Sequence, residues 1–317
     1  LCGFTNSFEQ LLVTRMLQGL GFGGEWAVGS VLIGEMIRAE HRGKAVGTVQ
    51  SGWAIGWGIA NLLFLLFYSI FPEQMAWRVL FWSGLLPALL VIYIRRNVSE
   101  PEVYSATRKE TQARGAHFAE IFGPQLLRTT VIACLMVTGM MAGYFATFFW
   151  LPTFLKTERG LSVMSTGLYS FVIIVGSFAG YLAAAYASDI LGRKKTFIIF
   201  AAASAAIAVL YTLVPISNTA MLFLGFPLGF FVSGNFSGCG PYLTELYPSR
   251  VRGSGQGFTY NFARGMSAFS TPLVGYLSNT ITLGRGIGVV AVTGFAVVIF
   301  MVLLLPETKG KVLVAYD

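Results

Sequence analysis

Apolar residues run along this chain in long blocks, whereas a soluble domain carries shorter alternating or amphipathic patterns. Nine blocks reach the roughly 20 residues that a helix needs to cross a lipid bilayer. The pattern therefore predicts an all-α polytopic membrane protein. The expected spans are Phe8–Gly34, Lys44–Ile70, Ala76–Ile94, Thr129–Leu155, Ser162–Ala187, Lys195–Pro215, Thr219–Thr244, Val251–Leu277 and Arg285–Leu305.

One long polar stretch, from Arg95 to Arg128, interrupts the series of spans. It mixes basic and acidic residues and separates three spans from six. We therefore expect three parts: a bundle of three helices in residues 1–96, a linker in residues 97–127, and a bundle of six helices in residues 128–317.

The composition supports a membrane protein, because 55% of the residues are hydrophobic and only 11% are charged. The net charge of +8 would suggest a nucleic-acid partner in a soluble protein, but here its placement matters more. Predicted loops on one side hold 16 Lys and Arg residues, and those on the other side hold 4. Basic loops favour the cytoplasm. We therefore expect a cytoplasmic linker and C-terminus, a lipid environment and no nucleic-acid partner.

A motif occurs twice, 210 positions apart. Glu35, Arg42, Gly43 and Gly47 recur with the same spacing as Glu245, Arg252, Gly253 and Gly257. Both copies lie between two long apolar blocks. Duplicated halves in a membrane protein are typical of transporters, because related halves can rock about a shared site.

These features resemble the major facilitator superfamily, whose members have twelve spans in two pseudosymmetric six-helix bundles. The segment Gly180–Lys195 looks like the loop signature of that family, and residues 306–310 (Pro-Glu-Thr-Lys-Gly) resemble the motif that closes its last span. The resemblance covers the chain as spans four to twelve, so about three N-terminal helices are expected to be missing. It implies an inner (plasma) membrane transporter that works by alternating access and is functional as a monomer when full length.

The segment Arg15–Trp26 (RMLQGLGFGGEW) looks like the metabolite:proton symporters of this superfamily. The resemblance implies proton-coupled uptake of a small organic anion, such as a carboxylate. Two alternatives stay open: an efflux antiporter or a sugar or drug carrier of the same superfamily, and a transporter-like metabolite receptor. The chain shows no Walker motif, no metal-ligand spacing and no nucleophile–base pair. We therefore expect no enzyme activity, no metal and no cofactor.

Charged residues at the ends of several spans are expected to meet on the cytoplasmic side and to act as a gate. Opening that side would then break charge-assisted hydrogen bonds. The alternative is a solvated surface whose pairs contribute about 0–1 kcal/mol each. Glu35, Arg42 and Glu102 are expected to lack the partners they have in the complete family fold. The gate residues are Asp189, Arg193, Lys194, Glu35, Arg42, Glu245, Arg252 and Glu307.

Glu25 lies in the middle of the first span, where an ionised carboxylate costs about 2.5 kcal/mol or more unless it is paired or faces water. Such a group can exchange a proton with a cavity, so Glu25 is the candidate for proton coupling. The alternative is a structural ion pair with an arginine. Arg15, nearer the outer end of the same span, is a second coupling candidate or an ion-pair partner.

Arg264 lies in the middle of the eighth span, and its planar guanidinium suits a carboxylate. It is the first candidate for binding an anionic substrate; the alternative is an ion pair with a neighbouring helix, including Glu25. Polar side chains in other spans complete the predicted binding set, because buried amides need hydrogen-bond partners. They are Asn261, Asn235, Tyr144 and Gln50.

Three Gly-x-x-x-Gly pairs fall within the spans: Gly52 and Gly56, Gly176 and Gly180, and Gly225 and Gly229. Small residues at this spacing allow two helices to approach closely. We expect all three pairs to mark close helix packing.

Overall fold

The computed structural model describes residues 1–97 and 118–313, and all regular structure in these ranges is helical. The prediction of an all-α membrane protein is therefore confirmed. The α-helices are α1 (Phe8–Met36), α2 (Arg42–Ile70), α3 (Glu73–Ser83), α4 (Leu90–Asn97), α6 (Leu127–Thr157), α7 (Val163–Leu191), α8 (Arg193–Leu213), α9 (Asn218–Leu246), α10 (Arg252–Ser267), α11 (Ser270–Leu277) and α12 (Leu283–Leu304).

Six of the described helical segments are long and apolar enough to cross a membrane. They correspond to six of the nine predicted spans. Helix α1 covers a seventh predicted span without a break, but it carries Arg15, Gln18 and Glu25 and is not among the six. The six segments are Ala39–Ile70, Leu127–Thr157, Ser165–Leu191, Arg193–Leu213, Asn218–Leu246 and Leu283–Leu304.

The other two predicted spans are each divided into shorter helices. Residues 76–94 fall into α3, a short 3-10 turn (Leu86–Leu89) and α4, and residues 251–277 fall into α10 and α11. Helix α3 ends four residues before Pro87, and α10 ends five residues before Pro272. A proline ring clashes with the carbonyl group four residues earlier and offers no N–H group. Pro152, Pro227 and Pro241 nevertheless lie inside continuous helices, so proline alone does not decide a break.

Several helices begin at a hydroxyl side chain. The side chains of Ser7, Ser162, Ser217 and Thr282 accept a hydrogen bond from a backbone N–H group in the first turn of α1, α7, α9 and α12. Such a cap satisfies one of the four N–H groups that a helix leaves unpaired at its start. At the opposite end of the bundle, α2, α8 and α10 instead begin with arginine.

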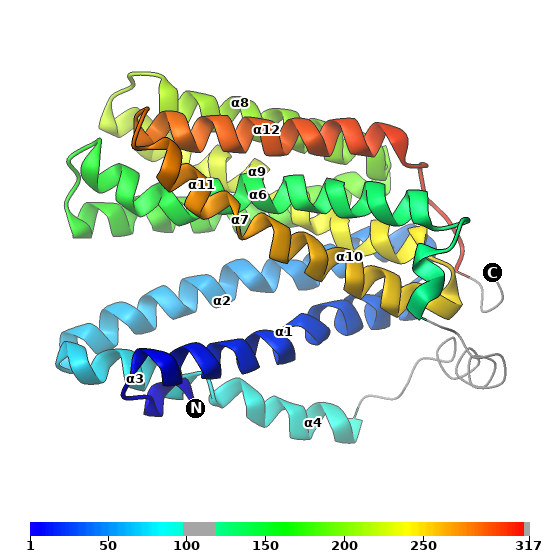
Figure 1. Cartoon of the computed structure of the whole chain (residues 1–317), viewed down its shortest axis with the longest axis horizontal. Coiled ribbons are helices and arrows are strands. Elements are labelled where there is room, and N and C mark those ends of the chain that lie inside the picture. The colour runs from blue at the N-terminus through cyan, green and yellow to red at the C-terminus, as the bar shows by residue number, and fades with distance from the viewer. Residues whose placement is uncertain (98–117, 314–317) are drawn as a thin grey trace.

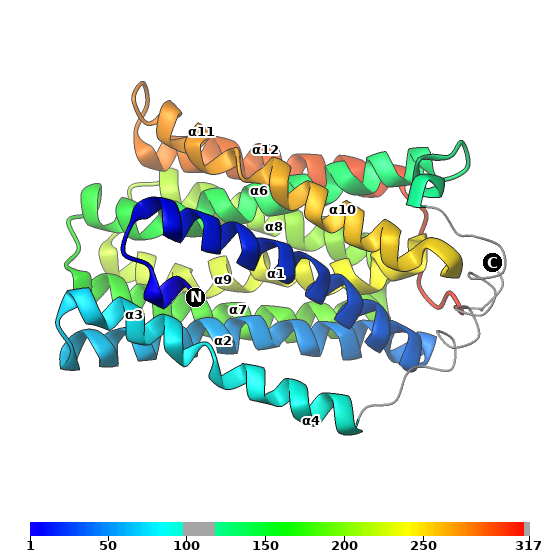
Figure 2. The same ribbon diagram turned by 60° about the horizontal axis from the view of Figure 1, so that its bottom comes forward.

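The helices form two groups that lie side by side (Figure 1 and Figure 2). Helices α1 to α4 form one group, and α6 to α12 form the other. Contacts between the groups are made by α2 with α7 and α9, and by α1 with α9 and α10. Each of these contacts joins helices that are more than 90 positions apart in the sequence, so the contacts form only on folding.

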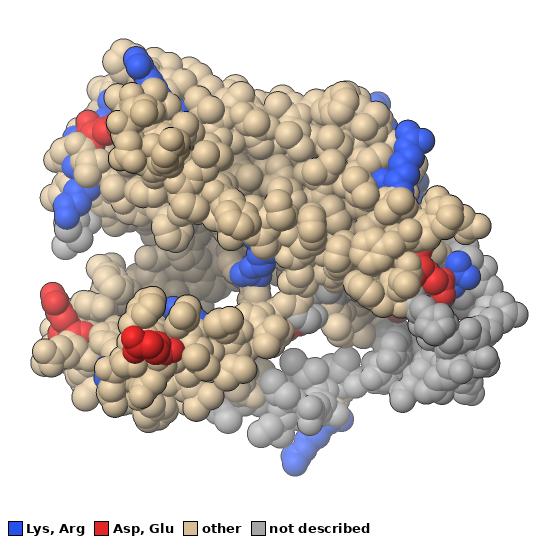
Figure 3. Space-filling model, viewed as in Figure 1, with Lys and Arg blue, Asp and Glu red and all other residues tan. Residues whose placement is uncertain are grey.

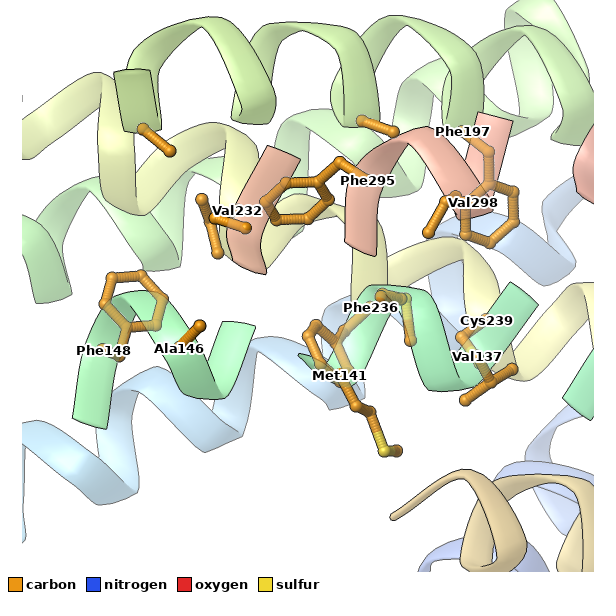
Figure 4. Packing of buried hydrophobic residues seen from close by; sticks show 14 of the residues in the cluster. Val137, Met141, Ala146, Phe148, Phe197, Val232, Phe236, Cys239, Phe295 and Val298 are labelled. Carbon is orange, nitrogen blue, oxygen red and sulfur yellow. The ribbon is translucent and has the colours of Figure 1, made fainter. Parts of the chain in front are cut away.

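The larger group has a continuous apolar core, in which α12 packs against α6 and α8 (Figure 4). Phe295 and Val298 of α12 are fully buried there, as is Val137 of α6. Helix α9 contributes Val232 and Cys239, which are also fully buried. This core contains residues of all seven helices of the group, α6 to α12.

Two of the three glycine pairs mark close helix packing, as predicted. A Cβ atom at Gly176 or Gly180 of α7 would overlap the carbonyl oxygen of Phe226 or Phe230 of α9. One at Gly229 of α9 would overlap a carbonyl oxygen of α7 in return. Only glycine lets these two backbones approach so closely.

For the third pair the prediction is wrong. A Cβ atom at Gly52 or Gly56 of α2 would meet no atom within 4 Å. Both residues line a cavity instead. The same Gly-x-x-x-Gly spacing therefore marks a contact on one helix and an open surface on another, because spacing does not say which elements face each other.

Candidate functional site

All eight predicted gate residues lie at one end of the bundle, which we call the charged end. It is formed by the C-terminal ends of α1, α7 and α9, the first residues of α2, α8 and α10, and residues 305–311 after α12. Arg42, Arg193, Arg252 and Glu245 are almost fully buried. Buried charges are costly unless they are paired, so their partners determine what this end can do.

The two copies of the repeated motif pair with each other. Nη1 of Arg42 lies 3.0 Å from Oε1 of Glu245, and Nη1 of Arg252 lies 2.7 Å from Oε1 of Glu35. Each arginine thus binds the glutamate of the other copy. The Nε atoms of Arg42 and Arg252 each donate to a carbonyl oxygen eight residues earlier, at 2.8 and 3.0 Å. The repeat therefore forms two equivalent contacts that join the two groups of helices.

Arg193 connects the two groups through a network of carboxylates. Its guanidinium donates to Asp189 at 2.7 Å and to both carboxylate oxygens of Glu245 at 2.9 and 3.1 Å. Asp189 of α7 also accepts the backbone N–H groups of Gly43 and Lys44 at 2.9 and 2.8 Å. Because Gly43 and Lys44 begin α2, Asp189 caps that helix from the other group and interacts favourably with its dipole.

Glu307 caps α8 in the same way. Its carboxylate accepts the backbone N–H groups of Arg193 at 2.9 Å and Lys194 at 3.0 Å. Burial opposes ionisation of Glu307, but the N–H donors of Arg193, Lys194, Lys309 and Thr308 outweigh it and hold the pKa of this carboxyl group below its usual value. The tight turn between α7 and α8 that presents these donors passes through Gly192, whose φ of 96° favours glycine.

Glu35 and Arg42 are expected to have lost the loop that they pair with in the complete family fold, but they are not left without partners. Both are nearly buried and bind residues of the larger group, Arg252 and Glu245. Glu102 lies outside the described residues. The fold brings the two copies of the motif together and so supplies these partners.

Between the two groups of helices, the surface is hollowed toward the end opposite the charged end (Figure 3). Trp53 of α2 lines three cavities, two of which also have lining residues from the larger group. The largest measures about 550 Å³ and is lined by Gly52, Trp53, Gly56, Trp57 and Tyr144. A cavity of this volume lies in the usual range for small-molecule sites.

The smallest cavity, of about 40 Å³, brings together three of the predicted substrate-binding residues: Gln50 of α2, Tyr144 of α6 and Arg264 of α10. The guanidinium carbon of Arg264 lies 4.3 Å from the centre of the Phe22 ring of α1. No carboxylate among the described residues forms an ion pair with Arg264, including Glu25. Its guanidinium therefore remains available to an anion from the cavity.

The two predicted asparagines do not line this cavity. Nδ2 of Asn261 donates to the backbone oxygens of Gly23 and Gly257, at 2.8 and 2.9 Å, and so joins α10 to α1. Asn235 is buried, and its Nδ2 atom donates to Ser204 at 3.1 Å. In this conformation both amides connect helices rather than face the cavity.

The two candidate coupling residues lie on exposed parts of α1. Glu25 lines a groove of about 270 Å³ between α1 and α2, together with Trp26 and Gln50. Arg15 donates to Gln18 at 3.1 Å and lies over the ring of Phe81 at 4.7 Å. Neither residue forms an ion pair with another described residue.

Sequence analysis missed a stacked pair beside the cavity. The rings of Trp26 (α1) and Tyr260 (α10) stack with centroids 3.5 Å apart, and Nε1 of Trp26 donates to Gln50 at 2.8 Å. The residue 210 positions after Trp26 is Phe236, which lines the cavity, and the residue 210 positions after Gln50 is Tyr260. Applying the shift of 210 positions to the residues beside the charged motif would have identified these four residues from the sequence.

A family model described as "Major Facilitator Superfamily" matches residues 1–187 and 174–315. The chain belongs to the Major Facilitator Superfamily. It is therefore a multi-pass membrane transporter rather than an enzyme.

This superfamily member is 41% identical over 310 residues to a protein of Cupriavidus pinatubonensis named "Probable 4-methylmuconolactone transporter", an alignment that covers 98% of this chain and 72% of that one. It is 27% identical to the cis,cis-muconate transport protein of Acinetobacter baylyi, over 97% of this chain and 75% of the relative. The solved structure of the proton:xylose symporter XylE superposes with a TM-score of 0.79 at 21% identity, covering 96% of this chain and 73% of that one. At that identity the superposition establishes the superfamily fold alone.

Proposed function

We propose that this Major Facilitator protein takes up a small organic anion together with protons by alternating access. The observation that carries the proposal is the unpaired Arg264 guanidinium beside a cavity between the two groups of helices. A cation held in an apolar site without a carboxylate partner attracts an anion strongly, because few other groups there can neutralise it.

The names of the relatives support an acidic substrate. Relatives aligned over 88% or more of this chain are named as transporters of 4-methylmuconolactone, cis,cis-muconate, niacin and sialic acid. We propose that this chain carries a carboxylate of comparable size, whose anionic group binds Arg264 with Gln50 and Tyr144 nearby. Asn235 and Asn261 are proposed to join the binding set only in a conformation in which α9 and α10 have moved.

The charged end is proposed to be the cytoplasmic gate. In the conformation described here, the pairs Arg42–Glu245 and Arg252–Glu35 hold this end closed while the opposite side of the cavity is open. Opening the charged end requires both pairs to separate, together with the bonds between Asp189 and the start of α2. Because these ion pairs and hydrogen bonds must break together, they can control a two-state transition between the helix bundles.

Glu25 is proposed to carry the proton, with Arg15 modulating its charge. Glu25 lines a groove, forms no ion pair with a described cation and adjoins Trp26. Trp26 in turn contacts Gln50 of the proposed substrate site. Protonation of Glu25 would therefore change the charge of α1 next to Trp26, the residue that contacts the proposed substrate site.

We further propose the organisation of the chain in the membrane. Residues 1–96 belong to an N-terminal bundle, residues 97–127 form a cytoplasmic linker and residues 128–317 form the C-terminal bundle. The excess of basic residues at the charged end favours the cytoplasmic side of an inner membrane, and the C-terminus would lie there too. A monomer is proposed to be sufficient for transport.

Uptake by the full-length transporter in proteoliposomes tests these proposals. Labelled carboxylates are supplied with and without an inward proton gradient. We expect one acid to accumulate above its outside concentration only when the gradient is present. Uptake that merely equilibrates would contradict proton coupling, and a transporter that moves none of the acids would contradict an organic-anion substrate.

A further inference from the structure

The small and large cavities share two lining residues, Trp53 and Tyr144, but they differ in volume and in the charge of their other lining residues. The small one, of about 40 Å³, has room for a compact polar group, because about 10–15 Å³ suffices for one water molecule. The large one, about 550 Å³, holds a ring or a short chain. The two cavities together therefore match a molecule with a compact anionic end and a larger body.

Charge is confined to the small cavity. Arg264 is its one charged lining residue among the described residues. The five residues that line the large cavity are two glycines, two tryptophans and a tyrosine, none of which is charged. A second carboxylate in the large cavity would lose its hydration without gaining a cation, a loss that normally excludes a charged group.

The shape of the large cavity favours a flat body. Trp53 and Trp57 lie one turn apart on α2, and the ring of Phe148 meets Trp57 edge-on with centroids 5.8 Å apart. Gly52 and Gly56 have no side chains, so they leave an open surface on α2 that lines the cavity beside these rings. Aromatic side chains along a cavity favour a planar, unsaturated ligand, because offset and edge-on ring contacts are the stable ones.

We propose that the substrate is a planar, unsaturated monocarboxylate whose far end is uncharged. Its carboxylate binds Arg264 in the small cavity, and its body lies along Gly52 and Gly56 against Trp53, Trp57 and Tyr144. Dicarboxylates of the same shape are expected to bind less well, because the described residues that line the large cavity include no second cation. This inference rests on the proposed function, since it requires an organic anion as substrate.

Competition between matched acids tests the inference on the full-length transporter. Terephthalate and its monomethyl ester share a ring and differ in whether the far end is charged. We expect the monoester to inhibit uptake of the transported acid at a concentration at least about tenfold lower than the diacid, which corresponds to about 1.4 kcal/mol. Equal inhibition, or stronger inhibition by the diacid, would overturn the inference.

The neutral dimethyl ester separates this inference from the proposed function. If the dimethyl ester inhibits as well as the monoester, no anion is required and the organic-anion function itself fails. If terephthalate and its monomethyl ester inhibit equally while the dimethyl ester does not, the proposed anion site is supported and only the proposed selectivity for monoanions is contradicted.

A second cation in the large cavity provides an independent test. Trp57→Arg is expected to move the ratio of the two inhibition constants toward the diacid by at least about tenfold, and Trp57→Phe is the matched control that adds no charge. An unchanged ratio in a folded Trp57→Arg variant would overturn the assignment of the far end to this cavity. Should that variant fail to fold, the comparison of monoester and diacid on the unmodified protein decides the question.

Discussion

Arg42 and Glu245 form an ion pair of 3.0 Å between residues of different copies of the repeated motif, and Arg252 and Glu35 form the reciprocal pair at 2.7 Å. The four residues are related by one shift of 210 positions. Because each pair joins a residue of α1 or α2 to one of α9 or α10, the two groups of helices cannot separate at this end without breaking both. The repeat thus encodes a symmetric contact rather than two independent ones.

The first prediction concerns this contact. Glu35→Gln leaves the buried Arg252 guanidinium without its carboxylate, and such a loss typically costs about 3–5 kcal/mol. We expect the charged end to open more often and a cysteine placed at Ile33 to react faster with a membrane-impermeant maleimide. Glu40→Gln, at an exposed position in the short connection between α1 and α2, is the control. Equal labelling of the two variants would argue against a gate.

A second prediction concerns Arg264. Arg264→Lys keeps the charge but loses the planar fork and its contact with Phe22, so the apparent affinity for the transported acid should fall by roughly 1–3 kcal/mol. Uptake measured over a range of substrate concentrations reports this loss. Arg285→Gln, at an exposed position on α12, should leave the affinity unchanged. Normal affinity in Arg264→Lys would remove Arg264 from the substrate site.

A third prediction separates the proton from the substrate. Glu25→Gln cannot titrate, so accumulation driven by a pH gradient should disappear, whereas exchange of labelled for unlabelled substrate across the membrane should continue. Both processes are measured in the same proteoliposomes. If exchange also stops while the protein remains folded, Glu25 has a structural role instead of a coupling role.

The fourth prediction follows from the lowered pKa of Glu307. A carboxyl group whose pKa is lower in the folded state stabilises that state above its unfolded pKa, and this contribution is lost as the pH falls through the folded pKa. Closure of the charged end should therefore not change with pH near neutrality and should weaken only at pH values below the usual glutamate pKa of about 4.3. The labelling rate at Ile33→Cys, compared between Glu307 and Glu307→Gln from neutral to acidic pH, measures this. The glutamine variant should be weakened throughout and lose part of the acid dependence. An identical pH profile in both proteins would contradict the assignment.

The fifth prediction tests helix packing. Gly180→Ala introduces a Cβ atom that overlaps the carbonyl oxygen of Phe230, and overpacking of this kind typically costs about 1–3 kcal/mol. We expect a lower thermal unfolding temperature in detergent. Gly167→Ala, on the same helix with no atom within 4 Å of the new Cβ, should not be destabilised. A stable Gly180→Ala protein would mean that α7 and α9 have room to move apart.

The sequence by itself determined the all-α membrane fold, most of the spans and the residues of the charged end. Long apolar blocks and a repeated spacing are local signals, and the bilayer requires such blocks to form helices because their backbone groups find no other partners there. Arg264 could also be identified as a candidate from the sequence, because a charged residue inside an apolar block is costly wherever the helix lies.

Only the tertiary structure decided which residues meet. It paired Glu35 and Arg42 with the other copy of the motif, turned Gly52 and Gly56 toward a cavity, and used Asn235 and Asn261 to connect helices. These outcomes depend on how helices rotate and cross when distant segments pack together. A residue's partner across such a contact is set by the whole arrangement, and the spacing of residues along one helix does not contain it.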